Sequence, residues 1–327
     1  MSETVNIAAL AQSVATRIFN VFGWEMEGLQ DENFPCSKAE KHQTKSVGST
    51  HPVDCVFSYP DPFSTKQIYL IFDLKSYASS TIKTTDFAPY IRGLSKTIDC
   101  ARVSDPWQKR YVSSEITDWH VEGSLFVYNH DGNYDKSFKE KAKGLAPSSL
   151  SHGITSRIHL FCPDDISYLE SIAQDMKSYC GEHDLKFASR KFFFAQQLIH
   201  TPRDSLLPIA TIEMLRGQIL IVAFEKSDHQ FNYIVYLRGV GTEDEFEYLI
   251  TYLFRNGIMS LTRSVLFKGA NFGSDAQVDF DKARSNFWVR HYKMPEIWNS
   301  LECIKFDRVS RVTNNFSSVD ESKRRQK

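Results

Sequence analysis

The sequence predicts an α/β fold, with a mixed β-sheet flanked by helices, followed by a C-terminal α+β domain. Two neighbouring apolar runs, at 51–59 and 68–77, are rich in β-branched and aromatic residues, as strands are. Apolar side chains recur at helical spacing over 4–22 and again over 84–103. With 327 residues, the chain is long enough for two domains of ordinary size.

The remaining elements of the first domain follow in order along the chain. A short strand is expected at 24–28, and the polar, lysine-rich stretch 31–50 is expected to be a loop. Residues 60–66 contain the Pro and Asp typical of a turn, so 51–77 is interpreted as a β-hairpin. The later elements are a strand at 122–132, a strand at 157–162, a helix from Asp164 or Asp165 to Cys180, and a strand at 191–197.

A cluster of Pro, Asp and Ser at 200–208 indicates a domain boundary. Beyond it, strands are expected at 210–215, 219–225 and 232–239. Thr242 and Glu245 form the pattern of a capping box and predict a helix to Gly257. Residues 265–272 and 278–292 are expected to be strand or mixed segments. The expected domains are 1–198 and 208–312, with a polar tail at 313–327.

Composition limits the possible functions. No apolar run is long enough to span a bilayer and the N-terminus lacks signal-peptide features, so we expect a cytoplasmic protein that does not bind membranes. The six cysteines are scattered without a CxxC pair, which indicates reduced thiols rather than a zinc knuckle or disulfides. The formal net charge is −1. A DNA-binding chain of this charge must gather its Lys and Arg on one face, or use a partner's positive charge.

The hairpin carries a pattern suited to phosphodiester hydrolysis. Asp54 lies in its first strand, and Asp73 and Lys75 lie two residues apart in its second, so their side chains share one face. Two carboxylates can hold Mg²⁺, to which the carbonyl of Leu74 can add a further oxygen. The lysine can then reach the attacking water or the phosphate. Other acid-x-Lys spacings, such as Asp175–Lys177, do not follow an apolar strand. The alternative is that these are ordinary polar residues at a strand end.

Pro52-Val53-Asp54 and Asp73-Leu74-Lys75, placed between two helices, resemble the PD-(D/E)XK restriction-endonuclease-like nuclease superfamily over residues 4–165. The resemblance implies that Asp54 and Asp73 bind Mg²⁺ or Mn²⁺ and that Lys75 positions the nucleophilic water. The first helix of this superfamily often carries a glutamate, and Gln12 occupies the matching position here. Glutamine can contact a metal-bound water but supplies no charge.

The resemblance implies a Mg²⁺-dependent DNA endonuclease, of the kind found in prokaryotic restriction and phage defence. The C-terminal domain would bind DNA or a protein partner, and the protein is expected to act with a protein partner or as a homo-oligomer. Two alternatives stay open. One is a catalytically inactive scaffold subunit with the same fold, and the other is cleavage of RNA instead of DNA. His51, next to Pro52, is a further candidate as ligand or base, although a lone histidine is more often structural.

Overall fold

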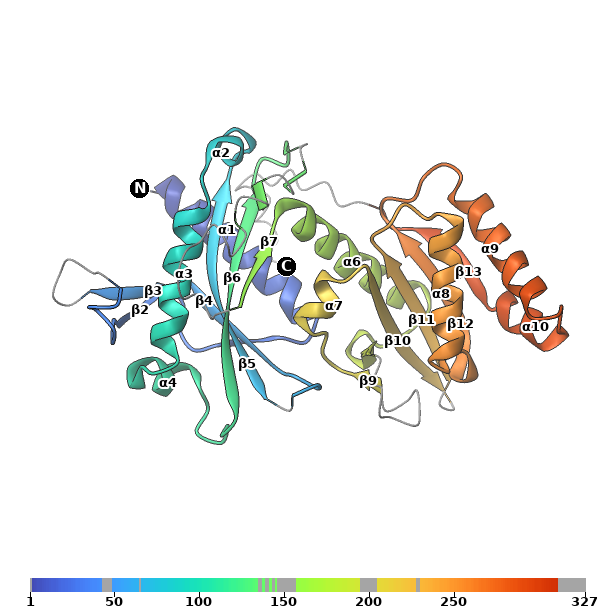
Figure 1. Ribbon diagram of the computed structural model, residues 1–327, viewed down its shortest axis with the longest axis horizontal. Helices are drawn as coiled ribbons and strands as arrows, with labels where there is room; N and C mark the ends of the chain where they lie inside the picture. Colours follow the sequence, from blue (N-terminus) through green and yellow to red (C-terminus); the bar gives the residue numbers. More distant parts are fainter. Residues whose placement is uncertain are drawn as a thin grey trace. The chain divides into compact units, whose positions relative to one another are not determined.

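The computed structural model describes residues 2–42, 49–64, 66–134, 137–138, 141–142, 145, 157–194, 205–227 and 230–310 (Figure 1). The chain divides into two compact units, of which one ends at Ser167 and the other begins at Tyr168. The expected boundary near 198–208 stays a prediction, because most of that segment lies outside the described residues. The expected tail, 313–327, also lies outside them. In the described part of the chain, no helix is long and apolar enough to cross a membrane.

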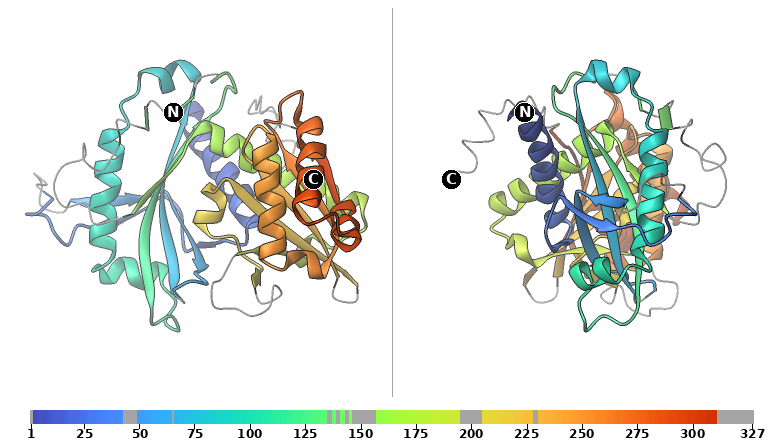
Figure 2. Two further views of the ribbon diagram at one scale, coloured as in Figure 1. Left: turned by 45° about the vertical axis from the view of Figure 1, so that its right-hand side comes forward. Right: turned by 90° about the vertical axis from the view of Figure 1, so that its left-hand side faces the viewer.

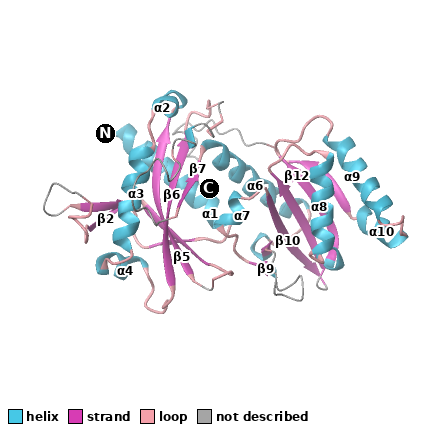
Figure 3. Cartoon of the chain, viewed as in Figure 1, coloured by secondary structure: helices cyan, strands magenta, loops and turns pink. Residues whose placement is uncertain are grey.

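The first unit is built on a five-stranded mixed sheet in the order β1-β4-β5-β6-β7. Strand β4 pairs antiparallel with both β1 and β5, whereas β5, β6 and β7 run parallel. Figure 3 shows the strands of the sheet in magenta and the helices beside them in cyan. The longest pairing joins β5 to β6 from Gln67↔Trp119 to Tyr77↔Asn129. The strands are β1 (Glu25–Glu27), β4 (Cys55–Pro60), β5 (Gln67–Tyr77), β6 (Trp119–Asn129) and β7 (Ile158–Phe161).

Helices cover both faces of this sheet (Figure 2). On one face, the ring of Phe19 from α1 (Ser2–Val21) packs 5.0 Å from that of Phe72 in β5, in an aromatic core. On the other face, Leu94 and Ile98 of α3 (Ala88–Ala101) are buried with β5 and β6 residues. A side chain at Gly123 of β6 would meet Ile98 at 2.6 Å, so glycine permits this close approach. The predicted mixed sheet flanked by helices is confirmed.

Smaller elements border this sheet. Strands β2 (Glu32–Pro35) and β3 (Thr50–Val53) form a separate antiparallel ribbon. The prediction of a loop throughout 31–50 was therefore wrong at β2. That strand buries a single apolar side chain, Phe34, which leaves little hydrophobic pattern in the sequence. The predicted helix 84–103 is confirmed as α3, with α2 (Ser79–Thr84) before it and α4 (Asp105–Tyr111) after it.

The second unit contains a six-stranded sheet in the order β13-β12-β11-β10-β8-β9. Helices α8 and α9 pack on one face through an apolar core that includes Phe246, Phe267 and Phe280. The strands are β8 (Arg190–Phe193), β9 (Leu206–Leu207), β10 (Ile219–Ser227), β11 (Gln230–Leu237), β12 (Thr262–Gly269) and β13 (Ile304–Arg308). The helices are α6 (Pro163–Glu182), whose first turn belongs to the first unit, α7 (Ile212–Arg216), α8 (Glu243–Arg255), α9 (Ala276–Arg290) and α10 (Pro295–Glu302), with 3₁₀ turns at Phe187–Ser189 and Ile258–Leu261.

Local sequence explains where predictions for this unit succeeded and failed. The Thr242–Glu245 capping box begins α8 as predicted. The strand predicted at 210–215 was wrong: the hydroxyl of Thr211 accepts the N–H of Met214 and starts the short helix α7. The segment 278–292 is also helical, because Phe280 and Phe287 lie two turns apart and are buried together on one side of α9.

Candidate active site

Strand β5 presents Asp73 and Lys75 on one face of the first sheet. Phe72 faces α1, so the alternation of a β-strand turns its neighbour Asp73 towards the α3 side. Asp73 lies opposite Leu125 of β6, in the middle of the sheet. The side chains of Asp73 and Lys75 are 21% and 20% exposed, so both are partly shielded and still reachable from solvent.

Asp54 lies in a bend between β3 and β4. The prediction that it lies inside one continuous strand was therefore wrong. The next residue, Cys55, pairs with Phe72, which places Asp54 beside the Asp73-Leu74-Lys75 segment. Its Oδ2 accepts the backbone N–H of Leu74 at 2.6 Å. The bend therefore turns the Asp54 carboxylate onto the backbone between the other two predicted site residues.

The ammonium group of Lys75 is held by three neighbours. It donates a hydrogen bond to Oδ1 of Asp73 and lies 3.4 Å from the carbonyl oxygen of Leu74. It also lies 4.9 Å from the ring centre of Tyr90 on α3, within the range of a cation–π contact. The Tyr90 hydroxyl is in turn 3.0 Å from that of Tyr77. Oxygens from Asp73 and Leu74 thus converge on one positive charge.

Burial dominates the electrostatics of Asp54. It raises the pKa of the Asp54 carboxyl above its ordinary value, while the Leu74 N–H and the Lys75 charge act to lower that pKa. The nearby charges of Asp73 and Asp31 add to the rise. Concentrated negative charge of this kind is relieved by a bound cation, which favours the ionised form of each carboxylate.

The donor set suits a hard divalent cation. Two carboxylates and one backbone carbonyl are the oxygen ligands that Mg²⁺ and Mn²⁺ prefer, with waters completing the shell. Asp73 and Leu74 are consecutive residues of β5, and the Asp54 carboxylate is joined to them through the Leu74 N–H. Asp54, Asp73 and Leu74 are therefore the residues that would hold the metal.

Gln12 has a different setting. It lies on α1, the helix that packs on the Phe72 face of β5, whereas Asp73 points to the other face. Its Nε2 is buried and has no hydrogen-bond partner among the described residues. Its role as a further ligand stays a prediction.

Sequence reasoning missed two residues of this site. Tyr90 orients Lys75 from α3, and Asp31 adds negative charge near Asp54, to which it is tied by its backbone N–H. Tyr90 occupies an apolar position in the predicted helix, so only the crossing of α3 over β5 distinguishes it from ordinary core residues. Asp31 precedes the unpredicted strand β2, without which its closeness to Asp54 has no signal in the sequence.

Comparison with known proteins identifies the family of the first unit. A search among curated proteins found no match. The model of one family, the GAPS4 protein PD-(D/E)XK nuclease domain, matches residues 1–165, which cover the first sheet, α1, α3 and all three predicted catalytic side chains. The match spans half of the 327 residues. The predicted superfamily is thus confirmed, and the chain belongs to the PD-(D/E)XK nuclease family of GAPS4 proteins.

Proposed function

We propose that the protein is a Mg²⁺- or Mn²⁺-dependent DNA endonuclease, with Asp54, Asp73 and Lys75 as its catalytic residues. The observation that carries the proposal is the convergence of the Asp73 carboxylate and the Leu74 carbonyl on the Lys75 ammonium. Asp54 joins the group through the Leu74 N–H. A nuclease fold with a matching donor set at the sheet face is the arrangement that metal-assisted phosphodiester hydrolysis needs.

The chain's own residues have distinct tasks in this reaction. A metal bound there supplies Lewis acidity and an acidified water. The carboxylates of Asp54 and Asp73 and the carbonyl of Leu74 would hold that metal, and the Leu74 N–H fixes the Asp54 carboxylate by a hydrogen bond. Lys75, held by Asp73 and the Tyr90 ring, is placed to align the water that attacks phosphorus and to balance the negative charge that develops as the P–O bond breaks.

The second unit is proposed to bind DNA or a protein partner. With a formal net charge of −1, the chain has no general excess of positive charge to hold a phosphate backbone. A partner or a second copy that contributes positive charge resolves this difficulty. Phage defence is the proposed setting, since the superfamily resemblance implies it.

The test is cleavage by the full-length protein, alone and with the product of a co-transcribed gene. Supercoiled plasmid, linear phage DNA and RNA are incubated with Mg²⁺ or Mn²⁺. DNA cleavage is expected in the wild type and is expected to be lost in the Asp73→Asn variant. Asp118→Asn is the control, because that side chain is 60% exposed and precedes β6 at the sheet's far end.

Three outcomes contradict the proposal in different ways. Cleavage that survives in the Asp73→Asn variant assigns the chemistry to another site. Cleavage of RNA but not of DNA would show that the substrate is RNA. Intact nucleic acids under every condition, together with partner binding that needs neither metal nor Asp73, support the non-catalytic scaffold instead.

A further inference from the structure

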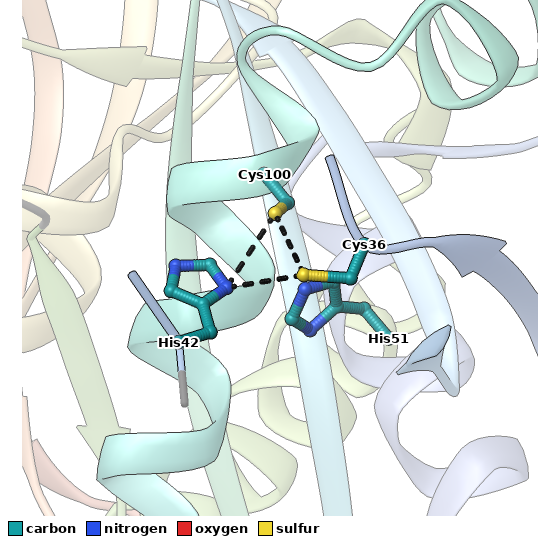
Figure 4. A group of neighbouring side chains, drawn as sticks. All are labelled: Cys36, His42, His51 and Cys100. Atoms are coloured by element: carbon teal, nitrogen blue, oxygen red, sulfur yellow. Dashed lines mark hydrogen bonds between the residues drawn. The ribbon is translucent and has the colours of Figure 1, made fainter. Parts of the chain in front are cut away.

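A second group of metal-binding side chains lies in the first unit, on elements outside the candidate active site. Cys36, His42, His51 and Cys100 each offer one donor atom, and these four atoms all lie within 4.8 Å of one another (Figure 4). Three of the residues are buried and Cys36 is partly exposed. We propose that they form a structural Zn²⁺ site, which goes beyond the proposed nuclease function.

The spacing of the donor atoms fits a zinc tetrahedron. Zn–S bonds of about 2.3 Å and Zn–N bonds of about 2.0–2.1 Å require tetrahedral edges of about 3.8 Å between sulfurs and about 3.5–3.6 Å between sulfur and nitrogen. The two sulfurs, of Cys36 and Cys100, lie 3.7 Å apart. The Nδ1 atom of His42 lies 3.4 Å from the first sulfur and 3.6 Å from the second. These three distances match the edges of a ligand shell, and the donor atom of His51 lies within 4.8 Å of each of the others. A disulfide needs its sulfurs about 2.05 Å apart.

Neighbouring groups orient His42 as a ligand. Its Nε2 lies 3.2 Å from Oδ2 of Asp99, so the Nε2–H donates a hydrogen bond to that carboxylate and the Nδ1 lone pair faces the sulfurs. Asp99 is itself fixed by Lys38 at 2.8 Å and Lys41 at 3.0 Å. A carboxylate that binds the far nitrogen of a histidine is the usual support of a zinc-ligating imidazole.

His51 is oriented in a similar way. Its Nδ1 lies 3.5 Å from the hydroxyl of Thr97 on α3, whereas its Nε2 is buried with no hydrogen-bond partner among the described residues. A buried polar atom of this kind costs free energy unless it binds something. Coordination to zinc would satisfy the Nε2 atom. Two thiolates, formed by release of two protons, and two neutral imidazoles balance the charge of one Zn²⁺ in this buried place.

Three of the ligands lie between residues 36 and 51, and the fourth, Cys100, comes from a helix much later in the chain. Cys36 directly follows β2, His51 lies within β3, and Cys100 lies in the last turn of α3. The β2–β3 ribbon is separate from the main sheet, so zinc would bind it to the helix layer. This gives the site a structural role, in keeping with a complete shell of four protein ligands.

Metal analysis of the full-length protein tests the proposal. After dialysis into metal-free buffer, mass spectrometry of the metals is expected to find about one zinc per chain. The content is expected to fall at least about tenfold in the Cys100→Ser and His51→Gln variants. Cys180→Ser is the matched control, because that thiol is also buried but lies on α6. Asp54→Asn is expected to keep its zinc, which separates this site from the nuclease site.

Cobalt substitution and chelation keep the test decisive if a variant fails to fold. Co²⁺-loaded wild type is expected to show a thiolate-to-cobalt charge-transfer band and the intense d–d bands of tetrahedral cobalt. A strong chelator is expected to lower the melting temperature, and added Zn²⁺ to restore it. The proposal is overturned by zinc far below one equivalent, by full retention in both ligand variants, by an octahedral cobalt spectrum, or by a melting temperature unaffected by chelation.

Discussion

Binding of Mg²⁺ or Mn²⁺ between Asp54 and Asp73 is expected to raise the melting temperature of the first unit, and Asp54→Asn and Asp73→Asn are expected to remove that increase. A ligand that binds only the native state stabilises it by about 2.7 kcal/mol at a hundred times its dissociation constant. One kcal/mol moves the melting temperature of a domain of this size by about 2–4 °C. The first unit, which ends at Ser167, is therefore expected to gain about 5–10 °C.

The Asp54→Asn variant has a second expected effect, in the absence of added metal. Burial raises the pKa of Asp54 in the folded protein above its unfolded value, so folding favours the protonated form. The stability from this group is complete below the unfolded pKa and is lost as pH rises through the folded pKa. At neutral pH the ionised carboxylate therefore opposes folding. Asn keeps an oxygen for the Leu74 N–H without the charge, so the metal-free variant is expected to melt above the wild type.

Scanning calorimetry of protein purified without chelator measures both effects while metal is titrated. Asp118→Asn is the control, because its exposed carboxylate pairs only with Lys66 at 3.2 Å among the described salt bridges and lies away from Asp73. A metal-induced increase of equal size in the wild type and both site variants would refute the reasoning. So would a wild type whose melting temperature neither metal changes.

Three further predictions concern the chemistry, the pH dependence and the second unit. Lys75→Met is expected to reduce the rate of cleavage about 10²–10⁴-fold in single-turnover assays, while the metal-induced increase in melting temperature persists. Loss of both the cleavage and the increase would show instead that Lys75 is needed for the folded structure of the site. Since metal binding needs ionised Asp54, the thermal shift is expected to diminish as pH falls through its raised pKa, and a shift independent of pH would contradict this. Asp175→Ala removes the 2.7 Å partner of Lys268, whose side chain is 9% exposed, and leaves it only Asp307 at 3.4 Å among the described ion pairs. The loss also leaves the Tyr236 hydroxyl without its acceptor, so it is expected to cost about 1–3 kcal/mol in urea denaturation. Lys282→Met breaks an exposed pair and is expected to cost less than about 1 kcal/mol; equal losses in the two would show that burial is irrelevant.

The placement of Asp73 and Lys75 on one face was predictable because it depends on short-range geometry. A strand repeats every two residues, so Asp73 and Lys75 share a face whatever the rest of the fold, and the apolar run before them identified the strand. The bend at Asp54 was not predictable, since 51–59 has the composition of one unbroken strand. Its cause is tertiary: residues before the bend pair with β2, and residues after it pair with β5.

The cluster of Cys36, His42, His51 and Cys100 could not be predicted from the spacing of cysteines and histidines along the sequence. The rule that structural zinc sites contain CxxC pairs excluded it, although Cys36 and His42 lie only five intervening residues apart. The other ligands, His51 and Cys100, join them only through the pairing of β2 with β3 and the packing of α3. A polar segment with one buried phenylalanine, Phe34, gave no strand signal, so the ribbon that assembles the cluster was itself absent from the prediction.

The two metal-binding groups meet at a single short segment. His51 belongs to the proposed zinc site, and Asp54, three residues later, belongs to the proposed nuclease site. The intervening Val53 is buried in the α3-side core, so this segment has little freedom to move. Asp54 is then positioned from both directions, by the ribbon on one side and by the pairing of β4 with β5 on the other. A catalytic carboxylate gains from such rigidity, because its misplacement by about 1 Å can cost about a hundredfold in rate. Zinc bound at His51 would therefore help to fix the Asp54 carboxylate of the proposed nuclease site.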